Sequence, residues 1–239
     1  MEIKRIKGNT WVIEANQLIP FYKLDSGRCV LLDTGLPEEQ EELERTLSTA
    51  GLTPVGVLCS HAHVDHCANN RRFQEKYGAE IALTFPEAGM CSSLLTLKCY
   101  FLTLSPGTVE RESSCMVHKP DRFIPPNDGP FTLGGVEFQI IQTPGHSAGH
   151  ICTVTPDNVC YTADALLSAG MLESKLPYNL SQAMAMDSRE KLRRLGCGFY
   201  VMAHRGVCSG EEIGPLIDAN QALIRRRADE ILSLVDRPM

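Results

Sequence analysis

The stretch that decides the fold runs from Val55 to His66 and reads Val-Gly-Val-Leu-Cys-Ser-His-Ala-His-Val-Asp-His. Its first half, Val55 to Ser60, is a short apolar run of the kind that forms a buried strand. Its second half holds three of the chain's seven histidines within six residues, together with an aspartate: His61, His63, Asp65 and His66. One such histidine could be a surface or core residue. Three beside an aspartate, directly after a strand, favour a metal site, because imidazole and carboxylate are ligands that suit zinc.

Three more predicted strands are each followed by a residue that can bind a metal. The ranges Val136–Thr143, Asn158–Ala163 and Phe199–Ala203 lead to His146, Asp164 and His204 respectively. The carboxyl ends of strands that meet at one edge of a layered sheet are where α/β folds build their sites. We therefore expect these residues to converge with the first cluster. We expect the two remaining histidines, His118 and His150, to be structural, with His150 a further candidate for supporting a ligand.

Length and composition limit the class of protein. The chain has 239 residues, of which 43% are apolar, and no low-complexity linker, so we expect one domain over residues 1–239. Its net charge is −6 and no basic patch is visible, which argues against a nucleic-acid partner. A small-molecule substrate is expected instead, and a homodimer is left open.

No segment is long and apolar enough to cross a membrane, and the first residues lack an apolar leader. We therefore expect a cytoplasmic protein with no membrane partner. The ten cysteines form no Cys-x-x-Cys pair, and several lie in apolar runs. In a reducing compartment they are best explained as buried small side chains.

Strands and helices alternate in both halves of the chain, which predicts an α/β or α+β fold. Predicted strands also cover Thr10–Ala15, Leu18–Leu24, Cys29–Asp33, Ile151–Thr155 and Val159–Thr162; predicted helices cover Pro37–Ala50, Asp187–Leu195 and the tail from Ile213 to Leu234.

The stretch from about Phe85 to Pro120 shows no alternating strands and is rich in large apolar residues. We expect it to form a lid or pocket wall beside the metal site, with Tyr100 and Phe101 facing the substrate. A pair of core helices and a dimer contact are the competing interpretations, since Leu94, Leu97 and Phe101 fall at helical spacing. Tyr178 is a further candidate to hydrogen-bond a substrate oxygen.

The order of these ligands resembles the metallo-β-lactamase superfamily, and so does the Leu-Asp-Thr-Gly turn at residues 32–35. The resemblance spans about residues 10 to 210 and implies a four-layer αββα sandwich with a binuclear centre at one edge. It implies that His61, His63 and His146 hold the first metal, that Asp65, His66 and His204 hold the second, and that Asp164 bridges them. Two Zn²⁺ ions are the expected cofactors, although iron and manganese accept the same ligands.

The implied chemistry is hydrolysis by a bridging hydroxide, with Asp65 and Asp164 as catalytic residues and Asp65 orienting the hydroxide or carrying its proton. Exported β-lactamases of this fold typically have cysteine where Asp164 stands, and glyoxalase II carries a C-terminal helical domain, so neither activity is expected as such. The chain is similar instead to short glyoxalase II-like or lactonase-like hydrolases of thioesters, lactones or related esters. A di-iron or mono-iron redox protein of the same fold, such as a dioxygenase, and a non-catalytic metal-binding regulator are the alternatives.

Overall fold

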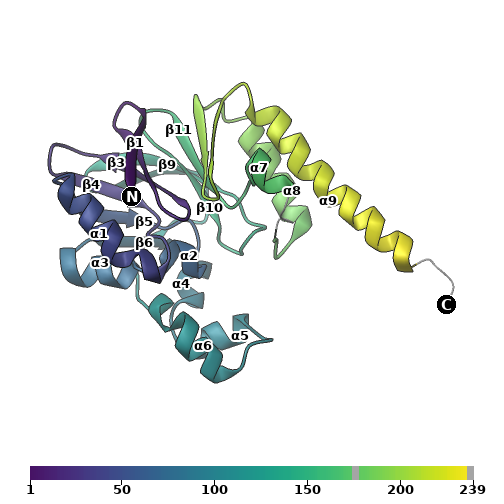
Figure 1. The fold of residues 1–239 in the computed structure, drawn as a ribbon, viewed down its shortest axis with the longest axis horizontal. Coiled ribbons are helices and arrows are strands. Elements are labelled where there is room, and N and C mark those ends of the chain that lie inside the picture. Colours follow the sequence, from purple (N-terminus) through teal and green to yellow (C-terminus); the bar gives the residue numbers. More distant parts are fainter. Residues whose placement is uncertain (174–177, 236–239) are drawn as a thin grey trace.

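Two mixed β-sheets form the centre of the molecule. The computed structural model describes residues 1–173 and 178–235, and its strands form a seven-stranded sheet in the order β1-β2-β3-β4-β5-β6-β7 and a six-stranded sheet in the order β13-β12-β11-β10-β9-β8 (Figure 1). In the first sheet, strands β1 to β4 pair antiparallel and β4 to β7 pair parallel. In the second, only β11 and β12 pair parallel.

The first sheet comprises β1 Glu2–Lys7, β2 Thr10–Glu14, β3 Leu18–Lys23, β4 Arg28–Leu32, β5 Thr53–Leu58, β6 Glu80–Thr84 and β7 Arg122–Ile124. The second comprises β8 Gly129–Leu133, β9 Val136–Gln142, β10 Ile151–Val154, β11 Val159–Ala163, β12 Phe199–Met202 and β13 Gly206–Ser209.

The helices fall into two groups. The first group comprises a 3₁₀ turn at Pro37–Glu39, α1 Gln40–Thr49, α2 Val64–Cys67, α3 Asn70–Tyr77, α4 Phe85–Met90, α5 Leu94–Tyr100, α6 Pro106–Ser113 and a 3₁₀ turn at Ser114–Met116. The second group comprises α7 Ala169–Leu172, α8 Gln182–Arg193 and α9 Ile213–Val235.

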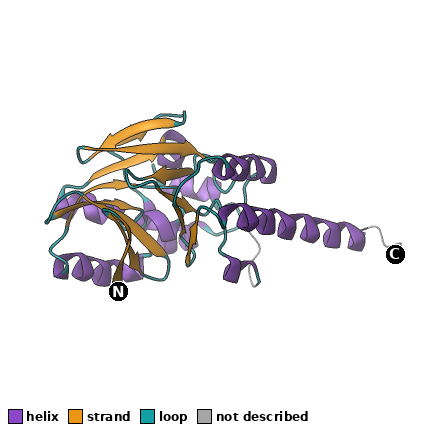
Figure 2. Ribbon diagram, turned by 90° about the horizontal axis from the view of Figure 1, so that it is seen from above, coloured by secondary structure: helices purple, strands orange, loops and turns teal. Residues whose placement is uncertain are grey.

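Three apolar cores show how these elements are layered. One core lies between the sheets, where Val30, Leu58, Phe138 and Val201 pack together. A second joins the first sheet to the first group of helices, and a third joins the other sheet to α8 and α9. Each sheet therefore buries both of its faces, and the four layers are helices, sheet, sheet and helices, as the αββα prediction requires. Figure 2 shows the strands and helices of this arrangement from above.

The predicted elements that carry the site are correct to within two residues. The stretch from 85 to 120, which shows no alternating strands, contains α4, α5 and α6. Leu97 of α5 is fully buried in the outer core of the first sheet, so part of the core-helix interpretation holds. Ser93 and Ser105 cap the starts of α5 and α6 by accepting hydrogen bonds from the Thr96 and Thr108 amides, which helps such short helices to form.

Within the described residues, no helix is both long and apolar enough to cross a membrane.

Candidate metal centre

Seven side chains gather at one edge of the sheets, where β5, β9, β11 and β12 end. The loop after β5 carries His61 and His63, α2 directly after it carries Asp65 and His66, and the loop after β9 carries His146. Asp164 follows β11 directly, and His204 lies two residues after β12. The sequence prediction that these strand ends converge is therefore matched by the geometry. Three overlapping groups of ligand atoms lie close enough together to hold a metal ion.

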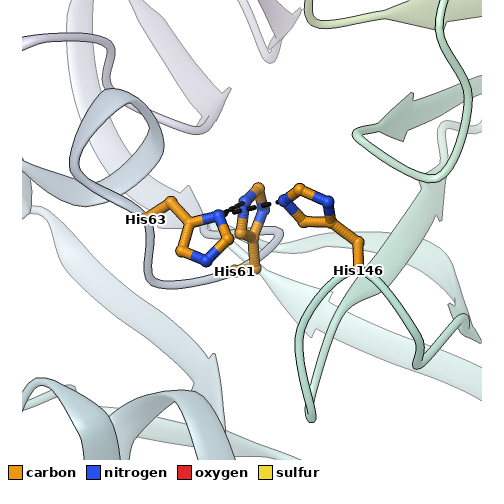
Figure 3. A group of neighbouring side chains, drawn as sticks. All are labelled: His61, His63 and His146. Carbon is orange, nitrogen blue, oxygen red and sulfur yellow. Dashed lines mark hydrogen bonds between the residues drawn. The ribbon is translucent and has the colours of Figure 1, made fainter. Parts of the chain in front are cut away.

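The first group consists of three imidazoles whose inner nitrogens point toward one another (Figure 3). The Nδ1 atom of His63 lies 3.0 Å from Nε2 of His61 and 2.9 Å from Nε2 of His146. On the outer side, Nδ1 of His146 donates to the carbonyl of Tyr178 over 2.8 Å, which leaves a lone pair on its Nε2 when the ring is neutral. Nε2 of His63 lies 2.9 Å from the Tyr100 hydroxyl.

Another group consists of the Asp65 carboxylate with His66 and His204. Oδ2 of Asp65 lies 3.5 Å from Nε2 of His66 and 3.6 Å from Nε2 of His204. Asp164 lies between the groups, with its carboxylate oxygens 3.4 Å from Nε2 of His146, 3.5 Å from Nε2 of His66 and 3.3 Å from Nε2 of His204. This position suits a residue that contacts two metals at once.

The residues present fit metal ions. Nε2 of His66 and Oδ1 of Asp164 are buried and have no hydrogen-bond partner among the residues that the structure describes. Buried polar atoms without partners are unfavourable, and so are nitrogen lone pairs that converge on one point. A divalent cation would satisfy both, and a set of imidazole and carboxylate donors suits zinc as well as iron or manganese.

Burial tunes the first group toward the neutral imidazoles that bind metal. It holds the pKa of His61 well below its ordinary value and lowers the pKa of His63 to about 3, with the neighbouring imidazoles adding to the effect. Burial alone would raise the pKa of Asp164, but the neighbouring histidines, His66 first, hold it well below the usual range. Asp164 is therefore ionised at neutral pH, as a metal ligand must be.

His66 behaves differently. Burial opposes its charged form, but the carboxylates of Asp65, Asp164 and Asp33 together raise its pKa well above the ordinary value. In the absence of metal the raised pKa therefore favours the positively charged form of this ring, with a proton on each nitrogen. A metal ion would displace that proton, so metal binding at this group is coupled to proton release.

Asp33 supports the site and was not identified as a functional residue from the sequence. Its fully buried carboxylate accepts hydrogen bonds from His66 Nδ1 over 2.7 Å, from Tyr161 over 2.7 Å, and from both the amide and the hydroxyl of Ser60 over 2.6 Å. It lies just after β4 with φ at 70°, a conformation that aspartate tolerates better than most residues. A carboxylate on the outer nitrogen of a ligating histidine fixes the orientation of the ring.

The two histidines outside the ligand set are buried and hydrogen-bonded. Nδ1 of His118 lies 2.8 Å from the carbonyl of Met116. His150 lies directly behind the site, where its Nε2 accepts a 3.3 Å hydrogen bond from the backbone amide of Asp164. The expectation that His150 could support a ligand therefore agrees with this contact.

The three candidate substrate residues lie in different settings. The Tyr100 hydroxyl contacts His63 directly, and the ring of Tyr178, which is more than half exposed, lies 6.0 Å from that of His63. Phe101 packs edge-on against Tyr100 at 5.1 Å and also lies against the outer core of the first sheet. Tyr100 and Tyr178 thus flank the first metal group, whereas Phe101 lies behind Tyr100.

Comparison with known proteins places the chain in a family. The model of the metallo-beta-lactamase superfamily matches residues 5–204, and the chain belongs to that superfamily. A hydroxyacylglutathione hydrolase of Mesorhizobium japonicum is 25% identical over 214 residues, covering 87% of this chain and 70% of the relative. The probable metallo-hydrolase YqgX of Bacillus subtilis is 23% identical over 184 residues, covering 77% of this chain and 81% of the relative.

Solved structures agree on the fold. A metallo-beta-lactamase family protein from Thermus thermophilus superposes with a TM-score of 0.73 at 22% identity, covering 93% of this chain and 79% of that one. A beta-lactamase from Chitinophaga pinensis gives a TM-score of 0.72 at 17% identity, covering 96% of this chain and 94% of that one. The fold prediction is confirmed, and the relatives support a metal-dependent hydrolase.

Proposed function

We propose that this protein is a hydrolase that uses two divalent metals, zinc by default, to cleave a thioester, lactone or related ester of a small molecule. The proposal rests on the convergence of seven ligand side chains in three overlapping groups, with Asp164 close to both His146 and His204. The names of the relatives favour a thioester within this class, because a hydroxyacylglutathione is an acylated thiol.

Two metals held in this way would polarise a substrate carbonyl and make hydroxide available at neutral pH. The chain's own residues then have separate tasks. Asp164 orients the two ligand groups relative to each other, and the hydrogen bond that its backbone amide donates to Nε2 of His150 holds it in position. The side chain of Asp65 is a quarter exposed, so this carboxylate can face the substrate and carry a proton during the reaction.

The tyrosines offer contacts to the substrate. The exposed ring of Tyr178 lies beside His63 and His146, so its hydroxyl can donate to a substrate oxygen. The Tyr100 hydroxyl is held against His63 and serves to orient that ring. We propose that a small-molecule substrate enters between these side chains. A cytoplasmic location remains a prediction.

Metal analysis of the native protein, joined to a panel of thioesters, lactones, phosphodiesters and β-lactams, tests this function. We expect two metals per chain and turnover of a thioester or lactone that a chelator abolishes and added metal restores. An Asp65→Asn variant should lower kcat more than it raises KM, because its role is in the chemical step. Iron content with colour and no hydrolysis of any substrate would contradict the proposal and favour the redox alternative.

The ligand assignment has its own test. Asp164→Ala should lose both metals or the coupling between them, whereas His204→Ala should mainly weaken the second metal. Stoichiometry measured after metal supplementation distinguishes these results. Wild-type stoichiometry and affinity in both variants would contradict the assignment.

A further inference from the structure

Glu87 is a buried carboxylate that the proposed chemistry does not use. It lies in α4, which begins directly after β6, and its exposed fraction is 2%. Oε2 accepts a 2.8 Å hydrogen bond from the backbone amide of Ala62. Oε1 accepts hydrogen bonds of 2.7 Å each from the Ser147 hydroxyl and the Gly149 amide. Burying a charged group is unfavourable unless it is well hydrogen-bonded, so a carboxylate at this place calls for an explanation.

The three donors lie in the two loops that supply the first metal group. Ala62 stands between His61 and His63, and Ser147 directly follows His146. One loop extends from β5 of the first sheet and the other joins β9 to β10 of the second sheet. A single carboxylate therefore connects the ligand loops of both sheets, one loop on each of its oxygens.

The second loop is seated closely against the start of α4. Thr84 donates its hydroxyl to the carbonyl of Gly149 over 2.8 Å. A Cβ atom at Gly149 would lie 2.3 Å from the Thr84 hydroxyl and 3.1 Å from Glu87, so only glycine permits this approach. The second loop is therefore held in one position against the start of α4, and Glu87 lies between this loop and the first ligand loop.

We propose that Glu87 is a positioning residue that sets His146 against the His61–His63 pair and thereby determines the affinity of the first metal. The proposal rests on the proposed metal centre, because it concerns how three of the ligands are held. A carboxylate fits the task because each of its oxygens can accept from a different loop, which a hydroxyl or an aliphatic side chain cannot do.

Glu87→Gln separates the positioning role from mere space filling. The amide has nearly the same shape but only one oxygen, which is best placed toward the two donors Ser147 and Gly149. Its NH₂ group then faces the amide of Ala62, and two donors cannot bond to each other. The variant should therefore release the His61–His63 loop while the other loop stays in place.

The experiment measures zinc or cobalt affinity by competition with a chelator in a His204→Ala background, where the first site dominates. We expect Glu87→Gln to weaken binding about 10–100-fold, the range seen when a group behind a metal ligand is removed. Ser147→Ala, which removes one of the three donors, should give a smaller loss. Urea unfolding of each variant verifies that it folds cooperatively.

Thr84→Val is the matched control. It removes a hydrogen bond to the same second loop from the same end of α4, but Thr84 makes no bond to Ala62. We expect its affinity to stay within about threefold of the parent, because the two ligand loops remain joined. Equal affinity in Glu87→Gln and the parent, or equal losses in Glu87→Gln and Thr84→Val, would overturn the proposal. Since the readout is metal affinity, it does not depend on which substrate, if any, is hydrolysed.

Discussion

At the scale of single residues, Asp33 fixes the tautomer and orientation of the His66 ring, although Asp33 is not itself one of the seven candidate ligands. It accepts a hydrogen bond from Nδ1–H of His66, so the Nε2 lone pair points into the site when the ring is neutral. Asp33→Asn can turn its NH₂ toward that nitrogen and favour the wrong tautomer. We expect the second metal to bind about 10–100-fold more weakly, measured by titrating the metal-free protein against a competing chelator.

Tyr161→Phe serves as the control for that change. It removes a 2.7 Å hydrogen bond to Asp33 but leaves the hydrogen bond that His66 donates to Asp33 intact. The loss of affinity should therefore be smaller than in Asp33→Asn. If Asp33→Asn binds both metals as tightly as the wild type, then Asp33 has no role in orienting His66.

The sequence reveals the ligands more readily than their supports. Histidine is scarce in this chain, so three in six residues after a strand form a visible pattern. Asp33 and Glu87 are ordinary acidic residues. The partners of Asp33 lie 27 to 128 residues away in the chain, and those of Glu87 lie 25 to 62 residues away. Only the fold brings these groups together, so no local pattern could have shown that they are buried at the site.

At the scale of elements, strands were easier to predict than short helices. β12 lies within one residue of the predicted range because its four apolar residues are flanked by turn residues and three of them are buried. α4, α5 and α6 have six to eight residues each, too few for a clear helical period. β1 was not predicted because four of its six residues are charged and its two isoleucines, Ile3 and Ile6, are three residues apart, which is not the alternation typical of a strand.

α5 is the element by which the lid hypothesis can be tested. We expect Phe101→Ala to change the preference for acyl chain length while metal content stays the same, because α5 carries Tyr100 to the site and Phe101 supports Tyr100. The preference is measured as kcat/KM over a series of substrates that differ in acyl chain length, and the metal content of each preparation is determined. Lost stability with an unchanged preference would assign Phe101 to the core alone.

Glu44 of α1 forms ion pairs with Arg72 and Lys76 of α3. Burial would raise the pKa of Glu44, but hydrogen bonds from Arg72 and Lys76 outweigh it and lower the pKa. Because the folded pKa is the lower one, the stabilisation is present above the unfolded pKa, about 4.3, and is lost as the pH falls through the folded value.

Glu44→Gln should therefore reduce the free energy of unfolding by roughly 0.5–1 kcal/mol at pH 7. The difference from the wild type should shrink as the pH falls below the unfolded pKa and vanish once the pH is below the lowered folded pKa of Glu44, where the carboxyl group is neutral. Urea unfolding of both proteins across this pH range measures it. A difference that persists unchanged at acidic pH would mean that the carboxylate charge is not what stabilises this contact.

At the scale of the whole molecule, the layered architecture follows from which faces are apolar. Both sheets bury both faces, so each needs a helical layer outside it, and the alternation of strands and helices already indicated this. The relative placement of α9 could not be predicted in the same way. Its apolar spacing continues to its end, yet Figures 1 and 2 show it extending beyond the rest of the molecule.

The two halves of α9 should have separate roles. In the first half, Asn220 forms two 3.0 Å hydrogen bonds with the backbone of Leu167, three residues after Asp164, and so supports that loop. From Arg225 to Val235 every residue is exposed, including Ile231 and Val235 at 60% and 73%. We expect a chain that ends at Arg225 to keep its metal stoichiometry and turnover, because the supporting half remains.

The exposed second half of α9 also bears on the oligomeric state, because exposed apolar side chains often mark interfaces. Light scattering of the full and truncated chains tests whether the protein is a homodimer. A dimer formed through this half would become a monomer on truncation. Loss of metal with no change in oligomeric state would instead show that the second half of α9 also supports the site.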